Sequence, residues 1–253
     1  TDVAANITLD QTEIHAIIGG ERNVTLRLGD GYVHSIELDD GADEGDGAGH
    51  FIKLGNGGVG ILSLGDGDNT IVGDSGFIDA IFAGAGDNVI NTHGSEVGVI
   101  GLGDGDDTVR LDADGYVVEL GGGNNTLTVG DGVHLEDMAS GDGRDRLTVG
   151  AGARIDTAQM GTGDDTVTLG EGARIDYLRL DEGNDVLSLA NGARVRFVLG
   201  WVDEDGLNGD HVITLTGDED DSNERTRIDV LQLDDGDDTV TLSGDARIKV
   251  IDV

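Results

Sequence analysis

The stretch GDDTVTLGEGARIDYLRL, residues 163–180, is one copy of a short repeat that decides the fold. Short runs of alternating apolar and polar residues follow one another in it without helical spacing, which is typical of β-strands. The parity of the apolar residues shifts between Ile175 and Leu178, so we expect a bend there and a cross-section with three sides. The alternating apolar residues are Val167 and Leu169, Ala173 and Ile175, and Leu178 and Leu180.

The repeat recurs along most of the chain. Its landmark is a glycine that precedes a pair of acidic or amide residues, and a fixed period of this kind indicates a solenoid. One coil cannot bury its apolar residues alone, but stacked coils can. We therefore predict an all-β fold, a right-handed parallel β-solenoid of about 12 coils of ~19–20 residues. The landmark glycines are Gly67, Gly86, Gly105, Gly123, Gly143, Gly163, Gly183, Gly209 and Gly236.

The repeat is least regular near the two ends of the sequence, which suggests three segments of one continuous domain. The first segment contains degenerate coils that suit an N-terminal cap, the second contains the regular coils, and the third contains coils with inserts. Inserts in solenoids lie on an exposed rim. The predicted segments are 1–64, with an acidic insert at 39–49, then 65–200, and then 201–253, with inserts at 201–208 and 219–225.

The composition narrows the classes of partner. The chain has 52 Asp and Glu residues against 15 Lys and Arg, a net charge of -37. Nucleic acids and anionic membranes attract basic surfaces, so we expect neither nucleic-acid binding nor membrane insertion, and divalent cations suit the chain better. Cysteine is absent, which excludes disulfides and thiolate metal sites. The chain opens at Thr1 without a signal-like segment, and we expect a processed piece of a secreted protein.

The acidic turns have the chemistry of a calcium site. Each presents Gly, a variable residue, Gly and two acidic or amide residues, as in GDGDN (65–69), GDGDD (103–107), GTGDD (161–165) and DDGDD (234–238). Glycines allow the positive φ angles that direct carbonyl groups to a common point, and calcium takes six to eight oxygen ligands. One turn offers too few oxygens, so we expect each ion to lie between two stacked turns.

These turns resemble half of the glycine- and aspartate-rich nonapeptide repeat of the RTX-type, or hemolysin-type, calcium-binding β-roll proteins. The second edge of each coil, as in GEGAR (170–174), lacks the ligand aspartate of that family, so the resemblance implies calcium along one edge only. It places the family's ligand at Asp107, Asp145, Asp165, Asp185 and Asp238, with Asn69, Asn88 and Asn125 at the same position elsewhere and a gap at His211. The further ligands expected from the stacked turns are Asp68, Asp87, Asp106 and Asp164 and the turn glycines Gly65, Gly103 and Gly161.

A second interpretation of these turns needs no ion. Asp and Asn are common in β-turns because their side chains hydrogen-bond to the local backbone. Carboxylates stacked at the spacing of β-strands repel one another, however, and this favours bound cations.

We expect a calcium-stabilised structural or adhesive module outside the cell or on a bacterial surface, and not an enzyme. No Ser, His and Asp set with catalytic spacing is visible. The open C-terminal end, residues 248–253, predicts self-association or stacking on further repeats. A polysaccharide-active enzyme, or its non-catalytic tail, is the alternative on fold analogy. Outward threonine pairs, such as Thr166 with Thr168, leave an ice-binding solenoid as a minor alternative.

Two further features have competing interpretations. Arg154, Arg174, Arg194 and Arg247 share one column with His134 on the second edge. They are expected to pair with Asp156, Asp176 and Glu136, and the alternative is a groove for an anionic glycan or a neighbouring rod. Trp201 lies in an acidic insert, either as a contact point or packed against the coils.

Overall fold

The computed structural model describes residues 5–10, 13–19, 23–39, 48–200, 209–218, 225–233 and 236–252. Most of the predicted acidic insert (40–47), the insert with Trp201 (201–208) and most of the last insert (219–224) lie outside the described residues. All regular elements of the described part are β-strands. The chain divides into two compact units, unit 1 (Thr1–Gly122) and unit 2 (Gly123–Val253).

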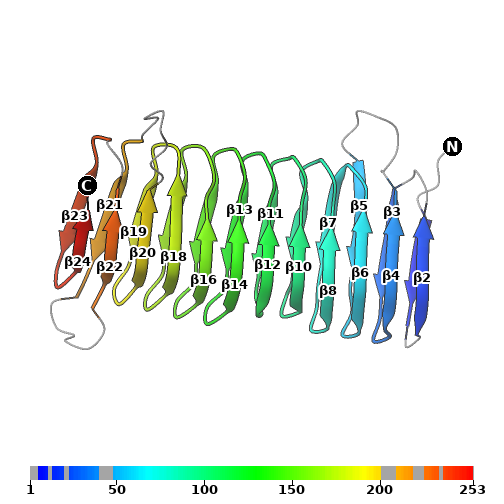
Figure 1. Ribbon diagram of the computed structural model, residues 1–253. Coiled ribbons are helices and arrows are strands. Elements are labelled where there is room, and N and C mark those ends of the chain that lie inside the picture. Colours follow the sequence, from blue (N-terminus) through cyan, green and yellow to red (C-terminus); the bar gives the residue numbers. More distant parts are fainter. Residues whose placement is uncertain are drawn as a thin grey trace. The chain divides into compact units, whose positions relative to one another are not determined.

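In unit 1, successive strands alternate between two parallel sheets, here the odd sheet and the even sheet (Figure 1). Each coil therefore contributes one strand to each sheet. The odd sheet contains β1 (Ala5–Leu9), β3 (Val24–Leu28), β5 (Ala48–Lys53), β7 (Asp68–Val72), β9 (Val89–Asn91) and β11 (Thr108–Leu111). The even sheet contains β2 (Ile14–Gly19), β4 (Val33–Leu38), β6 (Gly58–Leu64), β8 (Phe77–Phe82), β10 (Glu96–Gly101) and β12 (Gly115–Glu119).

Unit 2 has the same organisation. Its odd sheet contains β13 (Thr126–Val129), β15 (Arg146–Val149), β17 (Thr166–Leu169), β19 (Val186–Leu189), β21 (Val212–Thr216) and β23 (Thr239–Ser243). Its even sheet contains β14 (His134–Ala139), β16 (Arg154–Gln159), β18 (Arg174–Asp181), β20 (Arg194–Gly200), β22 (Arg227–Gln232) and β24 (Arg247–Asp252). The predicted all-β parallel solenoid is confirmed.

The prediction of three sides is wrong, because there are two sheets and Ile175, Leu178 and Leu180 all belong to one strand, β18. In β18, Ile175 and Leu178 are buried, whereas Asp176 and Tyr177 between them are both at least partly exposed. Two consecutive outward residues change the parity within the strand without starting a third sheet. The expected bend is thus a local irregularity of the even sheet.

The core lies between the two sheets and is formed by columns of aliphatic side chains. Leu147, Val167, Leu187 and Ile213 are partners in register on successive strands of the odd sheet, and each is fully buried. Burying one such side chain contributes about 1.5–3 kcal/mol. Since each coil supplies both sides of the core, stability increases as coils stack.

Glycine is required where consecutive acidic turns touch. Gly163 has φ +133°, and a Cβ there would overlap the carbonyl oxygen of Gly143 in the preceding coil. The glycine of the opposite turn, Gly172, also has a positive φ, but a Cβ there would meet no atom within 4 Å. Glycine is thus needed at Gly163 for both its backbone conformation and the lack of space, and at Gly172 for its conformation only.

The last coil of unit 2 leaves core positions open. Leu242 is 44% exposed and Ile251 is 51% exposed, although their register partners Leu215 and Leu231 are fully buried. No helix in the described part of the chain is long and apolar enough to cross a membrane.

Candidate functional site: two ladders along the acidic edge

Every acidic turn joins a strand of the even sheet to the next strand of the odd sheet. The turn that contains Asp106 and Asp107, for example, lies between β10 and β11, and the turn with Asp164 and Asp165 lies between β16 and β17. Within each unit, all these turns therefore lie along one edge of the coils, here the acidic edge. The two residues of each pair point to opposite sides of the turn, because they are consecutive in extended backbone.

The second residue of each pair points into the coil and forms the inner column. These side chains are at most 1% exposed from His50 to His211. Within each unit, the backbone N–H of each member donates a hydrogen bond to the side chain of the member in the next coil, as Asn88 N–H does to Asp107 Oδ1 at 2.7 Å. The inner column comprises His50, Asn69, Asn88 and Asp107 in unit 1, and Asn125, Asp145, Asp165, Asp185, His211 and Asp238 in unit 2.

In unit 1, the amides of the inner column satisfy both of their ends. Asn69 Oδ1 accepts the N–H of His50 at 2.9 Å. Asn69 Nδ2 donates to the carbonyl of Gly67 at 2.9 Å and to Asn88 Oδ1 at 3.0 Å, with a longer contact of 3.3 Å to the carbonyl of Gly65. The amide nitrogen is thus surrounded by oxygens, which a donor group satisfies.

In unit 2, carboxyl groups replace the amides at most of these positions. Asp165 Oδ1 accepts the N–H of Asp145 at 2.7 Å, but its buried Oδ2 has no hydrogen-bond partner. This oxygen stands where Asn69 carries its amide nitrogen. Asp185 Oδ2 lies 3.3 Å from Nδ1 of His211, and both side chains are fully buried. A bare carboxylate is an acceptor only, so the Asp165 site calls for a proton or a cation.

Burial changes the acidity of the inner carboxyl groups. Burial, with smaller contributions from the neighbouring carboxyls of Asp185 and Asp145, raises the pKa of Asp165 to about 8, against the bond from the Asp145 N–H. Burial likewise raises the pKa of Asp107 to about 6. The pKa of Asp185 is raised by burial, which His211 partly opposes. Asp165 therefore holds its proton at neutral pH when no cation is present.

The first residue of each pair points to solvent and forms the outer column. Its hydrogen bonds run in the opposite direction, because its acidic and amide side chains accept the backbone N–H of the next coil, whereas Arg144 has no acceptor atom. Asp68 Oδ1 accepts the N–H of Asp87 at 2.9 Å, and Asp87 Oδ1 accepts that of Asp106 at 2.8 Å. In unit 2 the outer column comprises Asn124, Arg144, Asp164, Asn184, Asp210 and Asp237.

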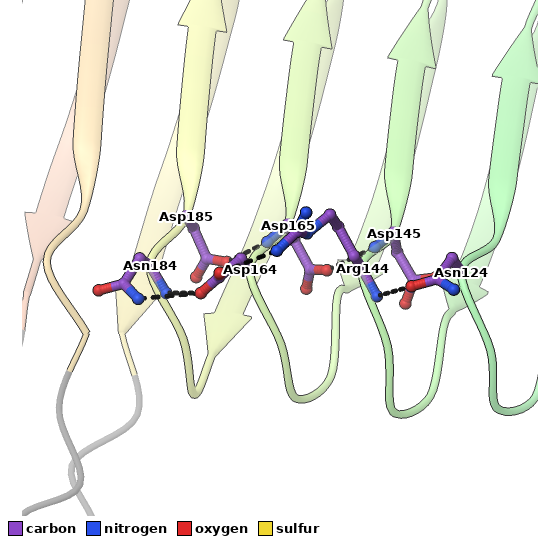
Figure 2. Close-up of polar contacts among 7 residues, drawn as sticks. All are labelled: Asn124, Arg144, Asp145, Asp164, Asp165, Asn184 and Asp185. Carbon is purple, nitrogen blue, oxygen red and sulfur yellow. Dashed lines mark hydrogen bonds and ion pairs between the residues drawn. The ribbon is translucent and has the colours of Figure 1, made fainter.

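Figure 2 shows both columns in unit 2, with Asp145, Asp165 and Asp185 in one row and the outer side chains in the other. Asp164 accepts the backbone N–H of Asn184 at 3.0 Å and its side-chain amide at 2.9 Å, and Arg144 lies 3.3 Å away. These bonds from Asn184, with a smaller contribution from Arg144, lower the pKa of Asp164. Consecutive aspartates of one turn thus have pKa values shifted in opposite directions.

The structure divides the predicted ligands between these two columns. The inner column contains the buried residues Asp107, Asp145, Asp165, Asp185, Asn69, Asn88 and Asn125 and the half-buried Asp238. The outer column contains the exposed residues Asp68, Asp87, Asp106 and Asp164. Gly65 accepts the N–H of Gly84 at 3.2 Å, Gly161 has φ +83°, and Gly103 lies in the same stack against Gly84. Among the described residues, no group of three or more His, Cys, Asp or Glu side chains is arranged to hold a metal ion.

Sequence reasoning treated both members of a pair as ligands of one ion and missed their separation. The alternation of side chains along extended backbone was the available signal, since Thr166 and Val167, which follow the pair, already alternate outward and inward.

The expected pairing of the basic column with nearby aspartates is confirmed for His134 and Arg154. Arg154 donates to Asp156 at 2.7 Å and to Asp176 at 2.8 Å, and His134 lies 3.1 Å from Asp156. Although partial burial raises it, these bonds from Arg154 and His134 lower the pKa of Asp156. The column also contains Arg227, which the insert before it hides in the sequence.

Family models, curated proteins and solved structures contain no match to this chain.

Proposed function

We propose that this chain is a calcium-stabilised extracellular β-solenoid that serves as a structural or adhesive surface module rather than as an enzyme. The observation that carries the proposal is the acidic edge, where a solvent-facing and a buried polar side chain recur in coil after coil. This regularity suits a repeating structural role, because a catalytic site needs a few residues that differ from the rest of the fold.

The outer column of unit 1 is the best candidate for calcium. Asp68, Asp87 and Asp106 are exposed and stack at the strand spacing of about 4.8 Å, so their charges repel one another. Calcium prefers carboxylate and carbonyl oxygens, which is the donor chemistry of this edge. The inner carboxyl groups, with Asp165 as the clearest case, would respond to a cation by losing their protons.

Ion binding would couple to folding. The chain carries a net charge of -37, which opposes any compact state. A cation that binds only the stacked turns stabilises the folded chain in proportion to its free concentration. A low calcium concentration would thus make the solenoid less stable, and a high concentration outside the cell would make it more stable.

Self-association is part of the same proposal. Leu242 and Ile251 are exposed in the last coil of unit 2, although the same columns are buried one coil earlier. The edges of β23 and β24 have no further strand beside them in the described chain. Another copy of the chain, or further repeats, would bury these residues and pair these edges, giving filaments or a surface layer.

Calorimetric titration of the protein with calcium, after a chelator has removed bound metal ions, tests the proposal, with far-UV circular dichroism in parallel. We expect uptake of several ions, together with a gain of strand signal and a higher melting temperature. Replacing Asp68, Asp87 and Asp106 by Asn should reduce the uptake. Asp131→Asn is the matched control, because Asp131 is an exposed acid at the opposite edge that also accepts a backbone N–H. No uptake and an unchanged melting temperature would contradict calcium stabilisation.

A further inference from the structure

A cationic pocket lies on the outer face of the even sheet of unit 2. It has a volume of about 260 Å³ and is formed by three successive strands, β18, β20 and β22. Its size suits one sugar-sized group better than a drug-sized ligand. The charged residues that line it are Arg174, Asp176, Arg194, Arg196, Arg227 and Asp229.

The pocket results from strand register. Arg174, Arg194 and Arg227 are direct partners on adjacent strands, so three arginine side chains extend in register from successive coils. Like charges in this arrangement repel one another unless anions lie between them. Arg174 is exposed and forms no ion pair within the described part of the chain, although this protein has a large excess of carboxylates.

The acidic residues of the pocket do not neutralise it. Asp176 already accepts a hydrogen bond from Arg154 of the preceding coil at 2.8 Å, and Asp229 is 3.4 Å from Nε of Arg227. The column of Asp176 and Asp229 is interrupted by Arg196, which adds a fourth positive charge. The pocket thus combines an excess of guanidinium groups, which donate hydrogen bonds, with two carboxylates that accept them.

An aromatic surface adjoins the pocket. Tyr177 and Phe197 are register partners whose rings stack at 4.9 Å with an angle of 11° between their planes. Tyr177 is 44% exposed because the change of parity in β18 turns it outward directly after Asp176. Exposed aromatic rings beside hydrogen-bonding groups offer an apolar face to a ligand with polar edges.

We propose that this face of β18, β20 and β22 binds an acidic polysaccharide, with the carboxylate of one uronic acid residue held by Arg174, Arg194 and Arg227. Carboxylates accept paired hydrogen bonds from guanidinium groups, and sugar hydroxyls donate to Asp176 and Asp229. The sugar ring packs against Tyr177. The inference rests on the proposed adhesive role and names the class of ligand for it.

A second copy of the chain is the other acidic partner that this row of arginines would attract. Its acidic edge offers carboxylates at the same spacing, but few hydroxyl donors for Asp176 and Asp229. Two chains that each carry a net charge of -37 also repel one another. The mixed lining and the aromatic rings therefore favour a polyhydroxylated acid.

Calorimetric titration of the folded full chain with a hexasaccharide of alternating glucuronate and neutral sugars tests the proposal. Because neutral sugars separate the glucuronates, this hexasaccharide chelates little calcium. The methyl ester of the same hexasaccharide is the uncharged control. We expect saturable binding with a Kd on the order of 0.1–1 mM, weakened by salt, and weak or absent binding of the ester. Arg174→Gln combined with Arg227→Gln should raise the Kd about tenfold or more, and Tyr177→Ser a few-fold.

Arg146→Gln is the matched control for these variants, because Arg146 is an exposed arginine on the odd sheet of the same unit. Equal weakening by Arg146→Gln, equal binding of the ester, or no saturable binding would overturn the proposal. Self-association that is lost on removal of Arg174 and Arg227, without glycan binding, would make the face an interface between copies and would also overturn it. Circular dichroism of each sample shows that the coils are folded, so a failure here is distinct from a failure of calcium stabilisation.

Discussion

The two units place their carboxylates on opposite sides of the same turn. In unit 1 the outer column is acidic, with Asp68, Asp87 and Asp106, and the inner column has the amides Asn69 and Asn88 before Asp107. In unit 2 the inner column is acidic from Asp145 to Asp185, and the outer column mixes amides, acids and Arg144. Apart from Arg144, the two units share one pattern of hydrogen bonds along the turns, because Asp and Asn each offer one oxygen to a backbone N–H.

This difference shows that the turn uses one accepting oxygen from each Asp or Asn side chain. The other terminal atom can be a carboxyl oxygen or an amide nitrogen. An outer carboxylate keeps its charge in solvent, as the lowered pKa of Asp164 illustrates. An inner carboxyl group is buried among acceptors and keeps its proton, as Asp165 illustrates. Unit 1 should therefore respond mainly to cations, and unit 2 to both cations and protons.

The largest expected effect is a pH dependence that separates the units in the absence of calcium. A carboxyl group whose pKa is raised on folding is stabilising below its unfolded pKa of about 4, and this stabilisation disappears as pH rises to its folded pKa. The loss for Asp165 continues to about pH 8, at roughly 1.4 kcal/mol per pH unit, whereas the loss for Asp107 ends at about pH 6.

Between pH 6 and 8, unit 2 should thus become less stable while unit 1 changes little. Hydrogen exchange of peptides from β17–β19 and from β9–β11, corrected for the intrinsic effect of pH, measures this difference. Equal loss of protection in both units, or greater protection of unit 2 at higher pH, would contradict the assignment of protons to the inner column.

Asn88→Asp would give unit 1 the inner chemistry of unit 2. Asn88 Nδ2 donates to the carbonyl of Gly86 at 2.9 Å and to Asp107 Oδ1 at 3.0 Å, and a carboxylate would lose both bonds and face two acceptors. We expect a loss of about 2–4 kcal/mol in the free energy of unfolding at pH 8, and a smaller loss at pH 5, where the new group is protonated.

Urea unfolding of Asn88→Asp at both pH values, followed by circular dichroism, measures the loss. Asn124→Asp makes the same chemical change at an exposed outer position and should alter the unfolding free energy by less than about 0.5 kcal/mol. A loss equal to that of the control, or independent of pH, would contradict the role of the inner amide.

Asp165→Asn is the reverse change in unit 2. The new amide would carry a permanent donor at the place where Asp165 Oδ2 has no hydrogen-bond partner. We expect a gain of about 1–3 kcal/mol at pH 8 without calcium, and a pH slope reduced by one proton between pH 4 and 8. Proton uptake on folding, measured by potentiometric titration, tests the slope, and an unchanged uptake would contradict it.

Much of the fold followed from the spacing of the apolar residues. Val167, Leu169 and their counterparts recur at the period of the coil, and this period indicates parallel strands stacked coil on coil. The number of sheets was harder to predict, because Asp176 and Tyr177 both face outward and change the parity within one strand. A sequence does not distinguish such an irregularity from a corner.

The sequence predicted which turns form the acidic edge, but not that their side chains form two separate columns. The glycine positions located it, and the positive φ of Gly163 confirms why glycine is needed there. Extending the alternation of Thr166 and Val167 back to Asp164 and Asp165 requires extended backbone at the pair, and the glycines before the pair do not predict this. The row of Arg174, Arg194 and Arg227 was only partly visible, because the insert before Arg227 breaks the period.

The smallest expected effect concerns the outer column of unit 2, where Arg144 stands in a row otherwise made of amides and acids. Its side chain is 72% exposed and lies 3.3 Å from Asp164, a geometry that contributes little to stability. Arg144→Asn should leave the urea midpoint unchanged within error. The pKa of Asp164, followed by carbon NMR of its carboxyl group, should rise slightly and stay below its ordinary value, because the bonds from Asn184 are the larger cause of its shift. A return to the ordinary value would show instead that Arg144 controls this turn, and that the outer column of unit 2 depends on ion pairs rather than on the ladder that it shares with unit 1.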